Sequence, residues 1–219
     1  MSIIAPSILN SDFLNLGESI EMINNSEAEW IHLDVMDGSF VPNISFGIPV
    51  VQAARRITQK PLDVHLMIVN PEKYIEPFRK AGADVINIHY EACKDKDLVG
   101  ILEKIKQEGA RPALAINPDT PISAITPYCK YVDMVLVMSV FPGFGGQKFI
   151  EATYDRVREL KSFLVNNSLD TLIQVDGGVS KENIAKLKQS GVDVMVVGSV
   201  IFNAEKPIET ISELNSLVQ

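Results

Sequence analysis

Leu172-Ile173-Gln174-Val175-Asp176-Gly177-Gly178 combines three structural signals. An apolar run of strand length ends in a carboxylate, and two glycines follow where the chain turns towards a helix. Two earlier apolar runs also carry ionisable residues near their ends, in His32-Leu33-Asp34 and Asp63-Val64-His65. Strands that end in polar residues before a turn are typical of α/β proteins that carry a site at the carboxyl ends of their strands.

Eight such apolar runs alternate with amphipathic segments. The predicted strands are Ile3–Leu9, Trp30–Asp34, Leu62–Met67, Val85–His89, Pro112–Ile116, Met134–Met138, Leu172–Asp176 and Val194–Gly198. The predicted helices include Phe13–Ile23, Tyr74–Ala81, Leu98–Gln107, Tyr154–Leu164 and Ile184–Gln189, with Ser11 or Asp12 and Ser180 as N-caps. Parallel strands that are buried on both faces are apolar throughout, as these runs are, so a parallel sheet is expected.

Eight strand–helix units in 219 residues predict one α/β domain over residues 1–219, a (β/α)₈ barrel of the TIM-barrel type. The main rival is an open, doubly wound sheet. Such a sheet usually carries its phosphate loop after the first strand. Here the first strand leads into Ser7-Ile8-Leu9-Asn10, and the glycine clusters follow the sixth to eighth strands, which favours the barrel.

Composition excludes several classes of protein. The formal net charge of −8 and the sequence pI near 4.9 argue against a nucleic-acid or anionic-membrane partner. Cys93 and Cys129 lack the spacing of a disulfide framework and are expected to be free thiols. The N-terminus lacks a signal-peptide pattern, and the longest apolar stretch, 194–202, is too short to cross a membrane. A cytoplasmic protein is therefore expected.

Four residues form a candidate metal site. His32 and Asp34 lie two positions apart on a strand, so their side chains share one face and can bind one ion with partners from other strands. His65 and Asp176 end two other strands. Burying these ionisable groups without a partner ion would be costly. The set of two imidazoles and two carboxylates suits one divalent metal ion, Zn²⁺, Fe²⁺, Mn²⁺ or Co²⁺.

Glycine clusters follow three consecutive strands and predict a phosphate-binding cradle. They are Pro142-Gly143-Phe144-Gly145-Gly146, Gly177-Gly178 and Gly198-Ser199. Ordinary turn geometry also favours glycine. Three clusters at one end of a barrel nevertheless fit a nest of backbone N–H groups and helix N-termini around an anion.

Other residues near strand ends admit two interpretations. Met36, Met67 and Met138 either fill the core or form an apolar lining over the metal site that excludes water. His89 ends the fourth strand, where an ordinary buried histidine is favoured over a functional one. The loop from Val35 to Gly47 is long, and we predict that it acts as a lid.

Together these blocks resemble the ribulose-phosphate 3-epimerase family. The matching segments lie in the family's order and span nearly the whole chain: Ala5-Pro6-Ser7, 32–38 (HLDVMDG), 40–43 (FVPN), 62–67 (LDVHLM), Val137-Met138, 142–147 (PGFGGQ) and 175–179 (VDGGV). Phe141 departs from the pattern, which has a polar residue such as Asn or Glu before Pro142-Gly143.

The resemblance implies a barrel of the ribulose-phosphate-binding type that uses one divalent metal. It also implies interconversion of D-ribulose 5-phosphate and D-xylulose 5-phosphate in the pentose phosphate pathway. The substrate-binding residues that it implies are Ser7, His65, Gly143, Phe144, Gly145, Gly146, Asp176, Gly177, Gly178, Gly198 and Ser199. A homo-oligomer, either a dimer or a hexamer, is also expected.

The residue types fit this chemistry. Inversion of the carbon beside a ketone removes a proton from one face and delivers one to the other, which requires two acid/base groups. Asp34 as base and Asp176 as acid satisfy that requirement in the direction from ribulose to xylulose phosphate. A bound cation would stabilise the enediolate charge.

Three other functions stay open at this point. One is a 3-epimerase for a hexulose 6-phosphate such as D-allulose 6-phosphate, with a longer pocket formed by Ser45, Phe46 and Phe141. A lyase would need an Asp-x-Lys-x-x-Asp motif or a Schiff-base lysine, and no predicted strand carries a lysine. The third is a non-catalytic sugar-phosphate-binding barrel, against which the paired acids argue.

Overall fold

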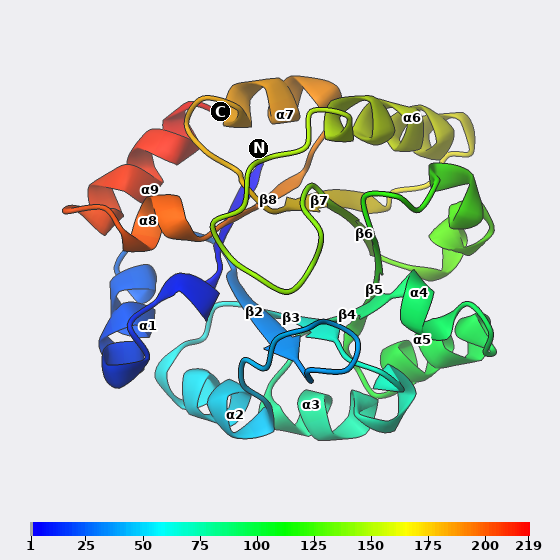
Figure 1. Cartoon of the computed structure of the whole chain (residues 1–219), viewed down its shortest axis with the longest axis horizontal. Helices are drawn as coiled ribbons and strands as arrows, with labels where there is room; N and C mark the ends of the chain where they lie inside the picture. The colour runs from blue at the N-terminus through cyan, green and yellow to red at the C-terminus, as the bar shows by residue number, and fades with distance from the viewer. Residues whose placement is uncertain (1) are drawn as a thin grey trace.

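The computed structural model describes residues 2–219 and shows a parallel eight-stranded barrel (Figure 1). Its strands are β1 (Ile3–Pro6), β2 (Ile31–Met36), β3 (Leu62–Met67), β4 (Val85–His89), β5 (Arg111–Ile116), β6 (Met134–Met138), β7 (Leu172–Asp176) and β8 (Val194–Val197). The hydrogen-bonded order is β1-β8-β7-β6-β5-β4-β3-β2, and an isolated parallel bridge between Ser7 and His32 brings β1 beside β2. The predicted barrel is confirmed.

The helices form a ring outside the barrel, as Figure 1 shows. They are α1 (Leu16–Asn24), α2 (Ile48–Ile57), α3 (Ile75–Ala81), α4 (Tyr90–Cys93), α5 (Leu98–Gln107), α6 (Thr153–Asn166), α7 (Ile184–Ser190), α8 (Ser199–Phe202) and α9 (Pro207–Ser216). Their inner faces and the outer faces of the strands form the main apolar core. Gly82 and Gly191 end α3 and α7 with φ of 114° and 108°, a backbone region that favours glycine after a helix.

The predicted bounds were wrong mainly near the N-terminus. The first strand ends at Pro6, and Ile8–Asn10 forms a 3₁₀ turn (η1) in place of further strand. Ser7 caps this turn, because its hydroxyl oxygen accepts a hydrogen bond from the Leu9 N–H. The chain thus turns away from the barrel immediately after Ser7.

Smaller differences follow the same cause, local side-chain hydrogen bonds. Asp12 caps a second 3₁₀ turn (η2), Phe13–Asn15, so α1 begins three residues later than predicted. Ser180 is not an N-cap: α7 begins at Ile184, and the Asn183 side chain accepts from the Ser180 N–H. At the other bounds, β2 extends to Met36, which removes two residues from the predicted lid loop.

The barrel interior is built in layers from side chains that alternate inward along each strand. Part of the interior is filled by an apolar cluster of Ala5, Trp30, Val85, Ala113, Met134, Val194 and Val196. Nearer the carboxyl ends lie three buried polar side chains, Asp63, Asn87 and Gln174, which are joined by hydrogen bonds through Gln174. The candidate metal ligands lie beyond this polar layer.

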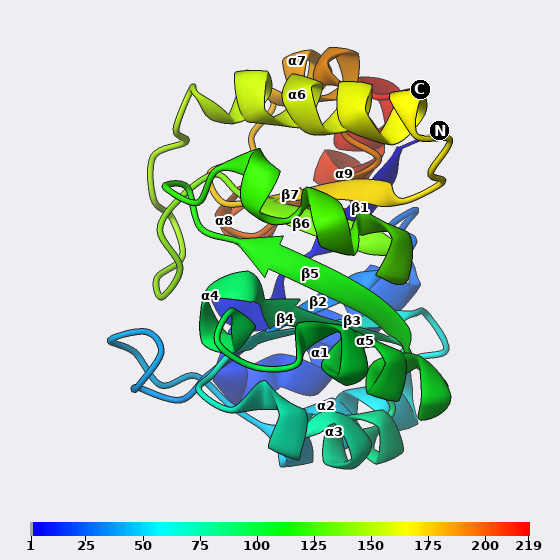
Figure 2. The same ribbon diagram turned by 90° about the vertical axis from the view of Figure 1, so that its right-hand side faces the viewer.

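Two long loops rise from the carboxyl ends of the strands, on the side towards which the β5 arrow points in Figure 2. One joins β2 to α2 and the other joins β6 to α6, and the second crosses in front of the barrel opening in Figure 1. The Asn43 side chain in the first loop donates to the Gly143 carbonyl in the second at 2.9 Å. Within residues 2–219, no helix has the length and apolar character needed to span a membrane.

Candidate active site

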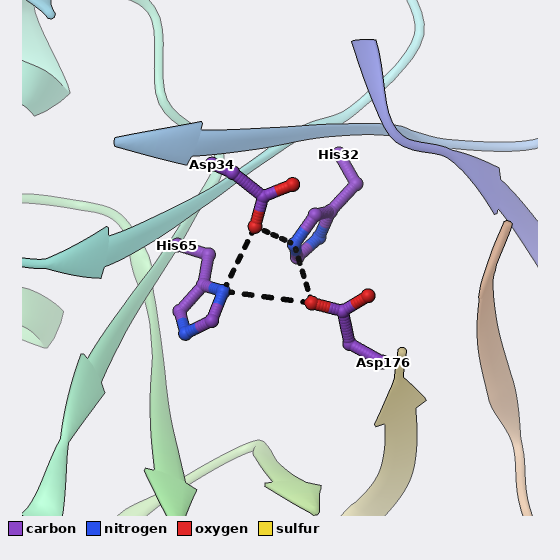
Figure 3. Close-up of side chains that lie close together, drawn as sticks. All are labelled: His32, Asp34, His65 and Asp176. Carbon is purple, nitrogen blue, oxygen red and sulfur yellow. Dashed lines mark hydrogen bonds and ion pairs between the residues drawn. The ribbon is translucent and has the colours of Figure 1, made fainter. Parts of the chain in front are cut away.

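The predicted metal ligands meet at the carboxyl end of the barrel (Figure 3). His32 and Asp34 come from β2, His65 from β3 and Asp176 from β7. Asp34 Oδ1 lies 3.2 Å from His32 Nε2 and 3.1 Å from His65 Nδ1. Asp176 Oδ2 lies 3.9 Å from each of those two nitrogens. Two imidazole nitrogens and two carboxylate oxygens therefore face a common point.

Strand register explains why Asp34 sits at the centre of this group. Asp34 pairs with His65 across the β2–β3 ladder, so the two side chains point inward side by side. The Ser7 hydroxyl donates to Asp34 Oδ2 at 2.6 Å, and the Ser45 hydroxyl donates to the Asp34 carbonyl at 2.5 Å. A hydrogen bond to a charged group contributes about 1.5–3 kcal/mol, so Ser7 holds the carboxylate in one orientation. Its predicted contact with substrate stays a prediction.

Each candidate histidine ligand has a partner at its other ring nitrogen. His32 Nδ1 lies 2.7 Å from Asp63 Oδ2, and that oxygen also accepts from Gln174 Nε2 at 2.5 Å. His65 Nε2 lies 2.9 Å from His89 Nε2, and His89 Nδ1 lies 3.0 Å from Glu91 Oε2. Partners of this kind fix ring orientation and tautomer in metal-binding histidines.

The two carboxyls of the site differ in their electrostatic surroundings. Burial raises the pKa of Asp34, but the charge and hydrogen bond of His32 and the hydrogen bond of His65 outweigh it, so the pKa lies well below its usual value. Burial and the neighbouring Asp34 charge raise the pKa of Asp176 to about 7. Asp34 is thus held as a carboxylate, whereas Asp176 takes up a proton readily.

The imidazoles differ in the same way. Burial lowers the pKa of His32, but the charges of Asp34 and Asp63 outweigh burial and raise the pKa well above its usual value. Burial lowers the pKa of His65, and it lowers the pKa of His89 to about 4. The electrostatic balance therefore leaves His65 and His89 neutral, the form in which an imidazole binds a metal or accepts a hydrogen bond.

The donor set fits a divalent metal ion. One ligand atom from each of His32, Asp34, His65 and Asp176 lies within 4.8 Å of all the others, and all four residues are buried or nearly so. Mixed nitrogen and oxygen donors suit zinc and the neighbouring first-row metals. Burial of four ionisable groups so close together is costly, and a cation bound among them would lower that cost.

A cleft opens above the ligands, with about 540 Å³ of space between protein atoms that is continuous with solvent. Asp34 and Asp176 lie at its base. The predicted substrate and lining residues that border it are Ser7, Gly143, Phe144, Gly145, Gly146, Gly177, Gly178, Gly198, Ser199, Met36, Met67 and Met138. The fully buried His32 and His65 are not among the residues that line the cleft.

Glycine is required sterically at one position of the predicted cradle, Gly178, and packs closely against a side chain at another, Gly198. Gly178 has φ of 62°, and a Cβ there would lie 2.7 Å from the Phe149 nitrogen. A Cβ at Gly198 would lie 2.2 Å from Asn10 Oδ1. Both glycines border the cleft, and the missing side chain lets the Phe149 backbone approach Gly178 and the Asn10 side chain approach Gly198.

Sequence reasoning missed three contributors. Asn10 borders the cleft between Gly145 and Gly198, but it lies beyond the first strand and carried no signal of its own. Asp63 was read only as part of a strand, although its spacing of two from His65 places both on the inward face. His89 was interpreted as an ordinary buried histidine, and the structure places it against His65.

Apolar side chains cover the metal-ligand side of the cleft. Met36, Val41 and Met67 form a buried cluster, with Phe40 packed against it. The Phe40 ring also lies 4.8 Å from the His89 ring, centre to centre. The loop after β2 thus packs on the His89 imidazole through Phe40. Met36 and Met67 combine core packing with contact to the cleft.

Comparison with protein-family models identifies a match over residues 3–202 to the ribulose-phosphate 3-epimerase family. The chain is 44% identical over 210 residues to a ribulose-phosphate 3-epimerase of Synechocystis, covering 96% of this chain and 91% of the relative. It is 43% identical over 212 residues to a ribulose-phosphate 3-epimerase of Bacillus subtilis, covering 96% and 97%.

Solved structures show the same barrel at lower identity. A 3-hexulose-6-phosphate synthase matches with a TM-score of 0.72 and 16% identity over 100% of both chains. A thiamine phosphate pyrophosphorylase from Pyrococcus furiosus matches with a TM-score of 0.68 and 15% identity over 99% of this chain and 95% of that chain. Those likenesses establish the fold alone, whereas the family match and the identities above establish that this chain belongs to the ribulose-phosphate 3-epimerase family.

Proposed function

We propose that the chain interconverts D-ribulose 5-phosphate and D-xylulose 5-phosphate by proton transfer at C3. One observation carries the proposal: Asp34 and Asp176 reach the base of one cleft from β2 and β7, on either side of the two imidazoles. Two acid/base groups in one site are what inversion beside a ketone requires. Family membership supports the same reaction.

In the direction from ribulose to xylulose phosphate, Asp34 removes the C3 proton and its carboxylate becomes a carboxylic acid. The electron pair of the broken C–H bond delocalises onto the ketone oxygen and gives an enediolate. Asp176 then delivers its proton to the opposite face of C3, which restores the ketone with inverted configuration. The reverse reaction exchanges the two roles, so each carboxyl acts once as acid and once as base.

His32, Asp34, His65 and Asp176 would hold one divalent ion, Zn²⁺, Fe²⁺, Mn²⁺ or Co²⁺. When bound, such an ion supplies positive charge next to the enediolate oxygens. Met36, Met67 and Met138 border the cleft beside the reacting groups and exclude water from them. Ser7 keeps the Asp34 carboxylate directed at the cleft through its 2.6 Å hydrogen bond.

The phosphate of the substrate is proposed to bind in the glycine-rich half of the cleft. The backbone of the loop after β6, together with Gly177, Gly178, Gly198 and Ser199, borders the space there. The positions of the Asn10 amide beside Gly145 and Gly198 support a contact to the same group. Neutral N–H donors suffice for this anion, which is consistent with a chain of net charge −8.

The test is turnover of D-ribulose 5-phosphate by the purified protein, followed together with its metal content. Removal of metal by a strong chelator should abolish turnover, and Mn²⁺, Co²⁺, Zn²⁺ or Fe²⁺ should restore it to differing degrees. In deuterated water the product should carry deuterium at C3, because the two protons pass through different exchangeable carboxyls. Full activity in protein shown to be free of metal would contradict the metal requirement, and an inactive, metal-loaded protein would contradict the reaction.

The substrate preference is tested with D-allulose 6-phosphate in the same assay. We expect a lower kcat/KM for this hexulose than for the pentulose, because the two relatives with 43–44% identity are both ribulose-phosphate 3-epimerases. A place in the pentose phosphate pathway and a cytoplasmic location stay predictions. So does assembly into a dimer or hexamer, which light scattering of the eluted protein would measure.

A further inference from the structure

We propose that Glu91 and His89 are positioning residues that set the tautomer of His65, so that the lone pair of His65 Nδ1 points at the metal site. The inference rests on the proposed metal-dependent function, because it concerns how that site is prepared for the ion. It deepens that function by assigning a task to a carboxylate that does not border the cleft.

The chain of contacts runs outward from the site through three residues. His65 Nδ1 faces Asp34 Oδ1 at 3.1 Å, and its other nitrogen, Nε2, lies 2.9 Å from His89 Nε2. The planes of the His65 and His89 rings are inclined by 26°, with centres 5.0 Å apart. His89 Nδ1 then lies 3.0 Å from Glu91 Oε2. Both imidazoles are fully buried, so water does not compete for these nitrogens.

Hydrogen-bond polarity along this chain is decided at Glu91. A carboxylate only accepts, so His89 must carry its proton on Nδ1 and present a lone pair at Nε2. That lone pair accepts from His65 Nε2–H, which leaves His65 Nδ1 without a proton. The site alone does not enforce this, because Asp34 lies close enough to accept from an Nδ1–H. Glu91 and Asp34 therefore favour opposite directions for the hydrogen bond between His65 and His89.

Glu91 is held so that only one of its oxygens faces His89. The other oxygen, Oε1, accepts from the Asn117 backbone N–H at 2.8 Å and from the Thr120 hydroxyl. Arg156 Nη2 in turn donates to the carbonyls of Asn117 and Thr120 at 2.8 and 2.7 Å. Residues of β4, α6 and the loop after β5 thus fix the carboxylate.

Glu91→Gln reverses the polarity with almost no change of shape. The Asn117 N–H is part of the backbone and cannot become an acceptor, so the glutamine oxygen stays on that side and its NH₂ faces His89. His89 then accepts at Nδ1, carries its proton on Nε2 and donates towards His65. We expect the affinity for Zn²⁺, measured by competition with a chromophoric chelator, to fall about 10–100-fold.

Glu72→Gln is the matched control, because it removes the same charge from a partly buried glutamate whose partner is Lys96 rather than a histidine. Its Zn²⁺ affinity should equal that of the unmodified protein. Equal affinity of Glu91→Gln and Glu72→Gln would overturn the inference. Thermal unfolding of the metal-free variants checks that each is folded before its affinity is compared.

A second measurement needs no variant. The chain has three histidines, His32, His65 and His89, so a long-range ¹H–¹⁵N spectrum of the imidazoles contains few signals. His89 should carry its proton on Nδ1 in both the metal-free and the Zn²⁺-loaded protein, because Glu91 fixes it before the ion arrives. His65 should at the same time carry its proton on Nε2 in the metal-free protein, which a role of Glu91 in packing alone does not require. A proton on His89 Nε2 in either state would overturn the inference.

Two substitutions at His89 separate hydrogen bonding from packing. His89→Gln can place an amide oxygen near the position of Nε2 and accept from His65, so its Zn²⁺ affinity should stay within a few-fold of the unmodified protein. His89→Leu fills similar space without an acceptor and should lose about 10–100-fold. Addition of Glu91→Gln to His89→Gln should lower the Zn²⁺ affinity no further, because the hydrogen-bond path from Glu91 to His65 is already interrupted. Equal losses for the two His89 variants would contradict the relay.

The outcomes distinguish this inference from the proposed function. If the unmodified protein binds no Zn²⁺ and epimerises without metal, the proposed function loses its metal, and the imidazole spectrum of the metal-free protein still tests the hydrogen-bond order. If Zn²⁺ binds and supports turnover but His89 has the opposite tautomer, the function stands and the relay is wrong.

Discussion

The two halves of the barrel mouth differ in what they present to the cleft: one presents mainly side chains and the other mainly backbone. On the side of β2 and β3 the site is made of side chains: His32, Asp34 and His65 are buried and held by hydrogen bonds. On the side of β6 to β8 it is made of backbone, with glycines that leave the main chain open to the cleft. Asp176, at the end of β7, is the exception in the second half, because its side chain joins the candidate metal ligands.

The difference reflects the chemistry of what each half is proposed to bind. A metal ion needs a few strong donors at fixed positions, so each ligand requires support from behind. A phosphate is large and accepts many weak hydrogen bonds, so close approach of N–H groups matters more than any one side chain. We therefore expect substitutions in the first half to affect metal binding and chemistry, and those in the second half to affect KM.

The largest effect is expected from Asp34→Asn. The amide cannot remove the C3 proton, and loss of a positioned base costs about 10²–10⁴-fold in rate, with more from the damaged metal site. Loss of C3 hydrogen to solvent should stop together with epimerisation.

Asp176→Asn should also abolish net epimerisation but leave slow exchange at C3. Near-normal turnover of either variant, with its metal content verified, would remove that aspartate from the mechanism.

Gly198→Ala tests the backbone half. The added Cβ would lie 2.2 Å from Asn10 Oδ1, so the Asn10 side chain must shift at the edge of the cleft. KM for D-ribulose 5-phosphate should rise about 10-fold with Zn²⁺ affinity unchanged. Gly17→Ala is the control, because its Cβ meets only Ile57 at an ordinary 3.7 Å. A change in metal affinity equal to that in KM would contradict the hypothesis that this half affects substrate binding alone.

Asn43→Ala tests whether the halves act together. The Asn43 side chain joins the lid loop to the Gly143 carbonyl across the mouth, and a neutral hydrogen bond of this kind contributes about 1 kcal/mol. We expect kcat/KM to fall about 5-fold, with normal metal content. An unchanged kcat/KM would mean that the two loops close independently.

The smallest perturbation uses the two cysteines to compare the stability of the barrel on the two sides of β5. Cys93 follows β4 and Cys129 precedes β6, and both are buried. Burial raises the pKa of the Cys93 thiol to about 12 and that of Cys129 to about 11, so the reactive thiolate forms only at strongly alkaline pH. At pH 8 neither should react with a thiol reagent until the protein unfolds, and both should then react together. Earlier labelling of Cys129 would show that the segment before β6 opens separately from the segment after β4.

Sequence patterns were sufficient for most of the fold because parallel barrel strands are apolar throughout. The bounds of β3, β4, β6 and β7 agree with prediction. The first strand was predicted too long, since an apolar run does not reveal that the Ser7 side chain caps a turn at Ile8. The apolar pattern does not depend on side-chain hydrogen bonds, so it could not predict that the strand ends before Ser7.

The site was predictable where ligands end strands and unpredictable where partners act from behind them. His32, Asp34, His65 and Asp176 stand at positions with recognisable chemistry, and the structure brings them together. Asn10, Asp63 and Glu91 act through contacts between distant segments. Glu91, for example, accepts from Asn117, 26 residues away, and no local spacing announces that pair.

The hydrogen bond from Gln174 to Asp63 has a consequence for the order in which the chain folds. It joins residues 111 positions apart, and Asp63 is the residue that orients His32. A chain emerging from the ribosome therefore carries three of the four candidate ligands long before β7 arrives to fix Asp63 and to add Asp176. The ion-binding geometry is thus completed only when the barrel closes, so tight metal capture reports a finished fold rather than an early fragment.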